Sequence, residues 1–415
     1  MLHLKLLPIG FNEPDAALIL EKTNSGKGYK MIMFVPPKNI EAELWDGPRT
    51  GLEGARKLFG ADEAYDSARF PSCLRELVNP HHHVYVDLPP PVPSPLTIEL
   101  AQRALGATQH HHGTDQEERV WLKWVPQYMR RRLGWKENGV NESRKSIKRL
   151  SPIVQELRIV KSSAEIALMR KAGDISAQAF IQGMKFTRPG VSEHQLYAKL
   201  DCECRMRGAQ MLAYVPVVAG GTNALSMHYV RNDMILRDGD LVLVDCGAEL
   251  NGYASDITRT WPVNGKFTDP QRELYQVVLN VQKKCIKLCT EKENISLHGI
   301  HDASVRYMRD ELDNIGFKIA EGDLDRKLYP HHVGHYLGLD VHDCHDLDRS
   351  RRLRPGMVVT VEPGIYVPHD STFPERYHGI GIRIEDNVLV GKEDPIVLSA
   401  QTPKELVDVE WCCNN

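Results

Sequence analysis

The sequence lacks any run of apolar residues long enough to cross a membrane. A transmembrane helix needs about 18 or more consecutive apolar residues, and no stretch of this 415-residue chain approaches that length. Charge of one sign is also scarce, because 52 Lys and Arg residues nearly balance 55 Asp and Glu residues and leave a net charge of -3. That balance gives no attraction toward nucleic acid or an anionic lipid surface. We therefore expect no nucleic acid and no membrane among the partners.

Disulfide and targeting signals are missing as well. The nine cysteines are an odd number scattered through a long chain, and the close pairs Cys202/Cys204 and Cys412/Cys413 lack zinc-site spacing. We expect all nine to be reduced thiols, as in a reducing compartment. The first residues, MLHLKLLPIGFNEPDAALIL, are interrupted by proline and by charges, and match neither a signal peptide nor an Arg- and Ser-rich transit peptide.

The length of the chain exceeds one ordinary domain and suggests two. In the first 100 residues, short apolar runs alternate with turn signals; they predict strands at Lys30–Val35 and His83–Leu88 and a loop at Glu43–Arg49. Residues 113–157 are rich in charge and have helical spacing. This part is typical of a small α/β domain, and we place its end near residue 158.

The second part combines predicted amphipathic helices with strand-rich segments. The stretch Leu241–Pro262, which reads LVLVDCGAELNGYASDITRTWP, is its most informative segment. Two strand-like runs flank Asn251-Gly252, a dipeptide typical of tight hairpin turns. Asp245 ends the first apolar run, and Asp256 lies in the return run.

The register of this hairpin decides how the two carboxylates face each other. If the dipeptide occupies the two central turn positions, Asp245 pairs with Thr258 and Asp256 lies diagonally; if the turn is centred one residue earlier, Asp245 lies opposite Asp256. The registers differ by an even step, so both place the carboxylates on one face. A divalent cation would turn their repulsion into attraction. The alternative is an exposed hairpin with two solvated acids.

Three further clusters carry potential ligands. Tyr329–Asp343 contains glycines that suit a backbone pressed close to a ligand. Its histidines are His331, His332, His335 and His342. Met357–Glu362 ends on a carboxylate, where a strand normally ends on a turn residue. Along Ile380–Glu385, Arg383 and Glu385 share one face. Taken alone, histidines are usually exposed or singly bonded, and the last two segments also fit a polar strand end and an Arg–Glu neighbour pair.

Together these segments supply four carboxylates and one imidazole: Asp245, Asp256, His335, Glu362 and Glu385. Four negative charges balance two divalent cations, and an oxygen-rich set with one nitrogen suits Mn²⁺, Co²⁺ or Zn²⁺ better than a thiolate-bound metal. Two such ions can share a hydroxide and polarise a carbonyl. The sequence therefore predicts a hydrolase with a dinuclear metal site.

The ligand order Asp, Asp, His, Glu, Glu resembles the pita-bread metallopeptidases, and HHVGHYLGLDVHD, TVEPGIY and GIGIRIED resemble the Xaa-Pro aminopeptidases (aminopeptidase P). LAYVPVVAGG, SDITRTWPVNGKFT and PHHVGHYLGLDVHD are similar to the mitochondrial branch of that family. GFNEPDA and ELWDGPRTG extend the likeness over nearly the whole chain.

The resemblance implies an α+β protein with two domains. Residues 158–415 would form the pita-bread catalytic domain, and residues 1–157 a smaller α/β, creatinase-like aminopeptidase P N-terminal domain. The family's first domain usually begins well upstream of the motif GFNEPD. The resemblance therefore implies a first domain that is N-terminally shortened.

The resemblance also implies a role for each metal-site residue. Asp245 would hold one metal ion and His335 the other, while Asp256 and Glu385 would bridge the two. Glu362 would be a ligand and the proton acceptor for the attacking water. The expected metal is Mn²⁺, with Co²⁺ or Zn²⁺ as alternatives.

Two histidines match catalytic positions of the family. His228 matches a histidine beside the scissile bond, and His342 matches one that steadies the oxyanion or the proline carbonyl. The residues implied in substrate binding are His331, Arg383, Tyr366 and Trp45. Of these, Trp45 matches a tryptophan of the first domain that reaches toward a substrate pocket, in some cases across a subunit interface.

The implied activity is hydrolysis of the N-terminal X-Pro bond of peptides and proteins whose second residue is proline. The resemblance implies a homodimer and a mitochondrial location, whereas the missing transit peptide favours the cytoplasm. Prolidase, a dipeptidase of the same fold, and methionine aminopeptidase, which usually lacks the long first domain, are alternative enzymes. A non-catalytic pita-bread scaffold is the alternative from another class, but all five ligands are retained.

Overall fold

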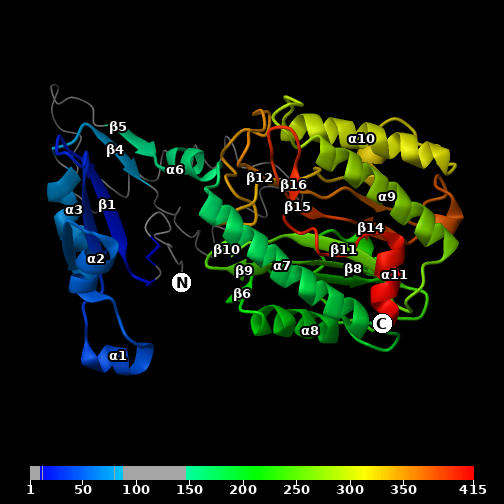
Figure 1. The fold of residues 1–415 in the computed structure, drawn as a ribbon, viewed down its shortest axis with the longest axis horizontal. Coiled ribbons are helices and arrows are strands. Elements are labelled where there is room, and N and C mark those ends of the chain that lie inside the picture. Colours follow the sequence, from blue (N-terminus) through cyan, green and yellow to red (C-terminus); the bar gives the residue numbers. More distant parts are fainter. Residues whose placement is uncertain (1–9, 12, 79, 87–145) are drawn as a thin grey trace, which may run out of the picture. The chain divides into compact units, whose positions relative to one another are not determined.

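The computed structural model describes residues 10–11, 13–78, 80–86 and 146–415 (Figure 1). The chain divides into two compact units, Met1–Leu150 and Ser151–Asn415. The division precedes the helix Ser151–Arg158, which therefore belongs to the second unit. Within the described residues, no helix combines the length and the apolar character that a bilayer crossing requires.

The first unit is built on a three-stranded sheet of order β1-β2-β3, in which β1 and β2 are antiparallel and β2 and β3 parallel. Its described strands are β1 (Ala17–Lys22), β2 (Tyr29–Val35), β3 (Glu63–Asp66), β4 (His83–Val86) and β5 (Ser146–Arg149). Its described helices are α1 (Ile40–Asp46), α2 (Gly51–Phe59) and α3 (Phe70–Val78). The predicted strand Lys30–Val35 is confirmed, and its buried side chains Met31, Met33 and Val35 pack against α2 around Phe11 and Ala55.

Two predictions for this unit are wrong in part. Residues 43–46 of the expected loop belong to α1, because Asn39 caps that helix by accepting a 3.0 Å hydrogen bond from the Ala42 N–H. The loop was predicted because the Gly-Pro that follows is a stronger turn signal than Asn39 is a helix signal. Ser146–Arg149 forms a strand parallel to β4 instead of a helix. The rest of the charged segment up to residue 145, like Asp87 and Leu88 of the other predicted strand, lies outside the described residues.

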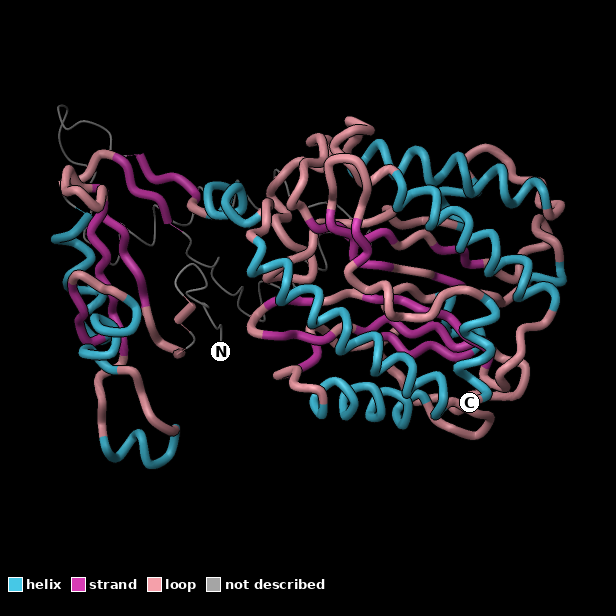
Figure 2. Tube along the Cα trace, in the orientation of Figure 1, coloured by secondary structure: helices cyan, strands magenta, loops and turns pink. Residues whose placement is uncertain are grey.

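The second unit places its strands between two helical layers, α7 and α8 on one side and α9 and α10 on the other (Figures 1 and 2). Its helices are α6 (Ser151–Arg158), α7 (Ser163–Phe186), α8 (Glu193–Met206), α9 (Asp269–Lys287), α10 (Leu297–Asn314) and α11 (Leu406–Asn414). Its strands are β6 (Met211–Leu212), β7 (Val217–Gly220), β8 (Leu241–Cys246), β9 (Ala248–Leu250), β10 (Tyr253–Ala254), β11 (Ile257–Pro262), β12 (Val358–Val361), β13 (Gly364–Tyr366), β14 (Gly381–Arg383), β15 (Asp386–Leu389) and β16 (Ile396–Val397).

Four small sheets make up the strand layer, with orders β11-β8-β7, β10-β9-β6, β12-β15-β16 and β13-β14. One cluster of buried apolar side chains joins this layer to both helical layers. Within it, the rings of Trp261 of β11 and Phe180 of α7 pack edge to face, with 6.2 Å between their centroids. The long helix α7 begins at a capping box, in which Ser162 and Glu165 satisfy each other's backbone N–H groups. The strand ends that carry polar residues thus belong to a layer that is packed between helices on both sides.

Candidate active site

The hairpin β8–β11 adopts the first of the two registers described above. Asn251 and Gly252 occupy the central turn positions with φ of 50° and 84°, the left-handed region that an Asn-Gly turn suits. Asp245 consequently pairs with Thr258. The Tyr214 hydroxyl contacts a carboxylate oxygen of both acids and lies 2.5 Å from Asp256 Oδ1.

The contact of Tyr214 with two acids restricts the charge that they can carry. One hydroxyl has one proton, so it cannot satisfy two ionised carboxylates at full strength. Burial raises the pKa of Asp245, whereas the hydrogen bond from His335 lowers the pKa of Asp256 against the opposing effect of burial. A bound cation or a proton on one acid would remove the conflict.

His335 and Glu362 reach the same place from a loop and from the end of β12. The loop runs beside the strand, since the Thr360 N–H donates to His335 O at 2.9 Å and the Glu362 N–H to Val333 O at 2.8 Å. Gly334 makes this approach possible, because a Cβ there would lie 2.0 Å from Thr360 O. A glycine in this segment therefore allows close backbone approach, although the neighbour is a strand and not a ligand.

Glu385 completes the group from the segment between β14 and β15. Its N–H donates to Thr258 O at 3.0 Å, and the Thr258 hydroxyl donates to its Oε2 at 2.7 Å. Its other oxygen, Oε1, is buried and has no hydrogen-bond partner. Burial and the neighbouring carboxylates raise the pKa of Glu385 well above its usual value. An unpartnered carboxylate oxygen in such a place is the kind of donor that a cation would satisfy.

The structure brings the five predicted ligands together. Donor atoms of Asp256, His335 and Glu385 all lie within 4.8 Å of one another. His335 Nε2 is 3.3 Å from Asp256 and 3.7 Å from Glu362, and Asp245 shares Tyr214 with Asp256. Burial raises the pKa of Glu362 to about 7. Four acids and one imidazole, largely buried and short of positive charge, fit divalent cations.

A chain of hydrogen bonds joins three of the other predicted residues to this group. Arg383 donates to Asp245 at 2.6 Å and to the Tyr366 hydroxyl at 2.9 Å. His331 Nδ1 lies 3.0 Å from a backbone carbonyl and must donate to it, so its Nε2 accepts from the Tyr366 hydroxyl at 2.9 Å. Burial, with Arg383 nearby, lowers the pKa of His331 to about 3. His331 is therefore neutral at physiological pH.

The two remaining predicted histidines differ in how closely they approach the group. The rings of His342 and His335 are 4.4 Å apart in a T-shaped contact, and the surroundings lower the pKa of His342 to about 4, chiefly by desolvation. His228 is an exposed residue close enough to influence the pKa of both His331 and His342. Trp45 lies in the first unit, on α1, where it is 86% exposed.

Two site residues escaped the sequence analysis. The Thr258 hydroxyl donates to Glu385 and accepts a 3.1 Å hydrogen bond from the Nε of Arg383. The only sign of this role in the sequence was its position opposite Asp245 in one of the two registers. Tyr214 lies in the segment LAYVPVVAGG, which was used only for its resemblance to the family, and its contacts are with residues 31 and 42 positions further along the chain.

Tyr214→Phe is expected to weaken metal binding by about 10- to 100-fold, the usual effect of losing a hydrogen bond to a ligating side chain. Competition with a calibrated chelator would measure the affinity. Tyr253→Phe is a matched control, because its hydroxyl donates at 2.7 Å to Glu165, which is not a predicted ligand. Equal affinities of the two variants would contradict the role of Tyr214.

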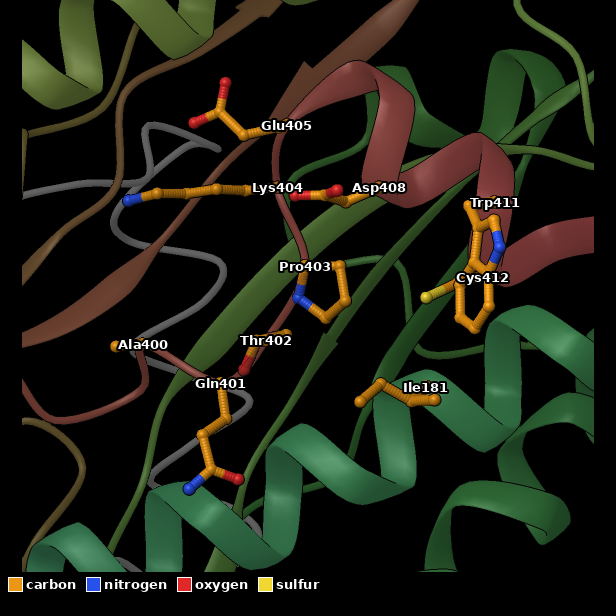
Figure 3. Close-up of a pocket in the computed structure, with 10 residues that line it drawn as sticks. All are labelled: Ile181, Ala400, Gln401, Thr402, Pro403, Lys404, Glu405, Asp408, Trp411 and Cys412. Carbon is orange, nitrogen blue, oxygen red and sulfur yellow. The ribbon is translucent and has the colours of Figure 1, made fainter. Parts of the chain in front are cut away.

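A surface hollow of about 440 Å³ lies elsewhere, where α11 meets the segment before it (Figure 3). Its lining residues include Thr402, Lys404, Trp411 and Cys412, and none of the predicted site residues. Lys404 also donates to the buried Asp386 at 2.6 Å. Because no predicted site residue lines the hollow, it is not the candidate active site.

Comparisons with known proteins agree with this geometry. Residues 167–392 match Metallopeptidase family M24, and residues 8–85 match the aminopeptidase P N-terminal domain. Xaa-Pro aminopeptidase 3 of Homo sapiens is 41% identical over 98% of this chain and 75% of that protein. Intermediate cleaving peptidase 55 of Saccharomyces cerevisiae is 39% identical over the same shares.

Solved structures give the same result. The crystal structure of Icp55 from Saccharomyces cerevisiae, lacking its N-terminal 58 residues, superposes with a TM-score of 0.81 at 37% identity, covering 97% of this chain and 86% of that one. Proline aminopeptidase P II from Yersinia pestis gives a TM-score of 0.80 at 34% identity, covering 98% and 88%.

The chain therefore belongs to metallopeptidase family M24 and is a metal-dependent hydrolase. Within that family it belongs with the Xaa-Pro aminopeptidases. The predicted fold, a pita-bread domain preceded by an aminopeptidase P N-terminal domain, is confirmed. The comparisons favour neither prolidase nor a non-catalytic scaffold.

Proposed function

We propose that the substrates are peptides and protein N-termini with proline at the second position, and that the enzyme cleaves the bond before this proline. The carrying observation is the largely buried group of five potential donors beside the Arg383–Tyr366–His331 chain. An X–Pro amide has no N–H to bind, so recognition needs a shaped surface and a grip on the carbonyl. Icp55 bound to the inhibitor apstatin and Escherichia coli aminopeptidase P with the inhibitor Pro-Leu are similar structures.

The proposed cofactor is a pair of Mn²⁺ ions, with Co²⁺ or Zn²⁺ as alternatives. Asp245 would hold one ion, His335 the other, and Asp256 and Glu385 both, with Glu362 as a further ligand. Bound ions of this kind polarise a carbonyl and lower the pKa of water. The unpartnered Oε1 of Glu385 and the mutual repulsion of the acids support this fit.

The remaining roles follow from the chemistry of each group. We propose that Glu362 accepts the proton of the attacking water, because it is a carboxylate of the donor group whose Oε1 lies 3.7 Å from His335 Nε2. Neutral His342 would donate to the developing oxyanion or to the proline carbonyl, and His228 would lie beside the scissile bond. His331, Arg383 and Tyr366 would shape the proline pocket, and Trp45 of the first unit would contact substrate.

We further propose that residues 158–415, together with the preceding helix α6 of the same unit, are the catalytic domain, and that the residues before α6 are the aminopeptidase P N-terminal domain. Assembly as a homodimer is the proposed oligomeric state. A mitochondrial location is supported by the similarity to intermediate cleaving peptidase 55, mitochondrial, of Arabidopsis thaliana, which is 36% identical; the cytoplasm is the alternative. Fractionation of cells that express the protein would distinguish the two compartments.

A peptide series tests the proposed specificity. With Mn²⁺ restored after chelation, X-Pro-Y tripeptides should be cleaved between X and Pro, X-Ala-Y poorly, and N-acetylated X-Pro-Y not at all. The X-Pro dipeptide should be cleaved more slowly than the tripeptide, as judged from kcat/KM. Faster cleavage of the dipeptide would indicate a prolidase, and equal cleavage of X-Ala-Y would remove proline from the proposed specificity.

A further inference from the structure

A fully buried carboxylate directly follows His342. The side chain of Asp343 has 0% exposure, and Lys161 Nζ, on a side chain only 1% exposed, lies 3.0 Å from its Oδ2. Arg158, the last residue of α6, donates to its other oxygen and, at 2.6 Å, to Asp340. Lys161 and Asp343 are 182 positions apart in the chain. Two cations near the start of α7 therefore hold the residue beside a predicted catalytic histidine.

Stability alone is a weak explanation for this cluster. Taking both members of an ion pair out of water costs about as much as their attraction returns. Burial by itself would raise the pKa of Asp343, but Lys161 and Arg158 lower it below its usual value. The carboxylate is thus charged at neutral pH, and its position is dictated by the two cations.

The backbone on the N-terminal side of His342 is folded around this carboxylate. The Asp343 N–H donates to Tyr336 O at 2.9 Å, one residue beyond His335. A Cβ at Gly338 would lie 2.5 Å from Asp343 Oδ2, so the turn packs directly on the carboxylate. A displacement of Asp343 would therefore move the segment that joins the two histidines.

The backbone on the C-terminal side of His342 is held by α6. The Ser151 hydroxyl donates to Asp346 Oδ2 at 2.6 Å, and the Gln155 amide both donates to that oxygen at 3.0 Å and accepts from the Asp346 N–H at 2.9 Å. Cys344 Sγ lies 3.5 Å from Gln155 O. The part of the loop that directly follows His342 is thus held by the short helix α6.

We propose that Lys161, together with Arg158, is a positioning residue for His342. Its pair with Asp343 fixes the backbone that carries the imidazole and keeps that ring against His335. This inference rests on the role in hydrolysis proposed for His342. A displacement of about 1 Å at a catalytic group can cost about 100-fold in rate, so a small shift of this loop lowers kcat while the metal ions and the fold remain.

The test uses the full chain loaded with Mn²⁺ and an X-Pro-Y tripeptide. Lys161→Met is expected to lower kcat by about 10-fold or more while KM and the metal content stay within about twofold of wild type. Lys161→Arg, which keeps the cation, should recover part of the loss. Lys199→Met is the control, because it removes a lysine from an ion pair with Glu203 on α8, and it should leave kcat unchanged.

A double variant separates positioning from a general loss of stability. If Lys161 acts through His342, then Lys161→Met/His342→Ala should have the kcat of His342→Ala alone. Wild-type kcat in Lys161→Met, or multiplication of the two losses, would overturn the inference. If Lys161→Met does not fold, Asp343→Asn, which keeps the shape of the side chain, carries the same comparison. Wild-type kcat in His342→Ala would instead refute the role on which the inference rests.

Discussion

Glu385→Ala is expected to abolish peptide hydrolysis and to lower the bound metal below two ions per chain. Glu385 lies at the centre of the donor group, where its Oε1 has no protein partner and its Oε2 accepts from Thr258. Without Glu385 the site binds fewer cations, and the remaining carboxylates then repel one another. Elemental analysis of the dialysed protein and the rate of X-Pro-Y hydrolysis measure the two effects, and His335→Ala should behave in the same way.

The control for this prediction is Glu203→Ala, which removes an acid that pairs with both Lys199 and Arg207 and is not a predicted ligand. It should keep both the metal content and the rate. Unchanged metal stoichiometry and rate in Glu385→Ala would eliminate the ligand assignment.

Stability should respond to Glu385 in opposite directions with and without metal. Its pKa is raised in the folded protein, so at any pH above the unfolded-state pKa the metal-free fold must either bind a proton at Glu385 or bury its charge, and both lower the stability. Glu385→Gln should therefore match or exceed the wild-type Tm after chelation. In the presence of Mn²⁺ the wild type should melt higher, because metal binding to the native state adds stability. Differential scanning calorimetry at pH 7, with and without chelator, measures both differences.

The sequence anticipated those parts of the site that follow from local patterns. The turn at Asn251-Gly252 limited the hairpin to two registers, and both of them placed Asp245 and Asp256 on one face. The positive φ of both turn residues selects between the registers. Glycine in the histidine segment anticipated the close approach of Gly334 to the β12 backbone, although the neighbour proved to be Thr360.

Contacts between distant segments could not be predicted in the same way. Thr258 meets Glu385 across 127 positions, and this contact depends on how β11 and the segment before β15 lie side by side. The helix α1 was missed for a different reason. Its single cap at Asn39 is a weaker signal than the Gly-Pro that follows, and α1 contains no buried residue to give an apolar pattern.

His342→Ala is expected to leave the bound metal unchanged and to lower kcat by about 100-fold, the typical effect of losing one hydrogen-bond donor to a developing oxyanion. The His342 ring packs against the ring of His335 in a T-shaped contact, with 4.4 Å between the ring centroids, but His342 is not itself one of the five predicted ligands. Its pKa of about 4 makes it neutral at pH 7. A neutral imidazole can donate one hydrogen bond to the transition state.

Whether the variant changes kcat or KM distinguishes this role from one in substrate binding. A group that acts only in the transition state lowers kcat and kcat/KM equally, whereas loss of uniform binding raises KM at constant kcat. His345→Ala is the matched control, because it removes a 65% exposed imidazole three residues further along the same loop, and it should have wild-type kinetics. Wild-type kcat in His342→Ala would refute the catalytic role, and a rise in KM alone would assign His342 to the binding of the proline residue.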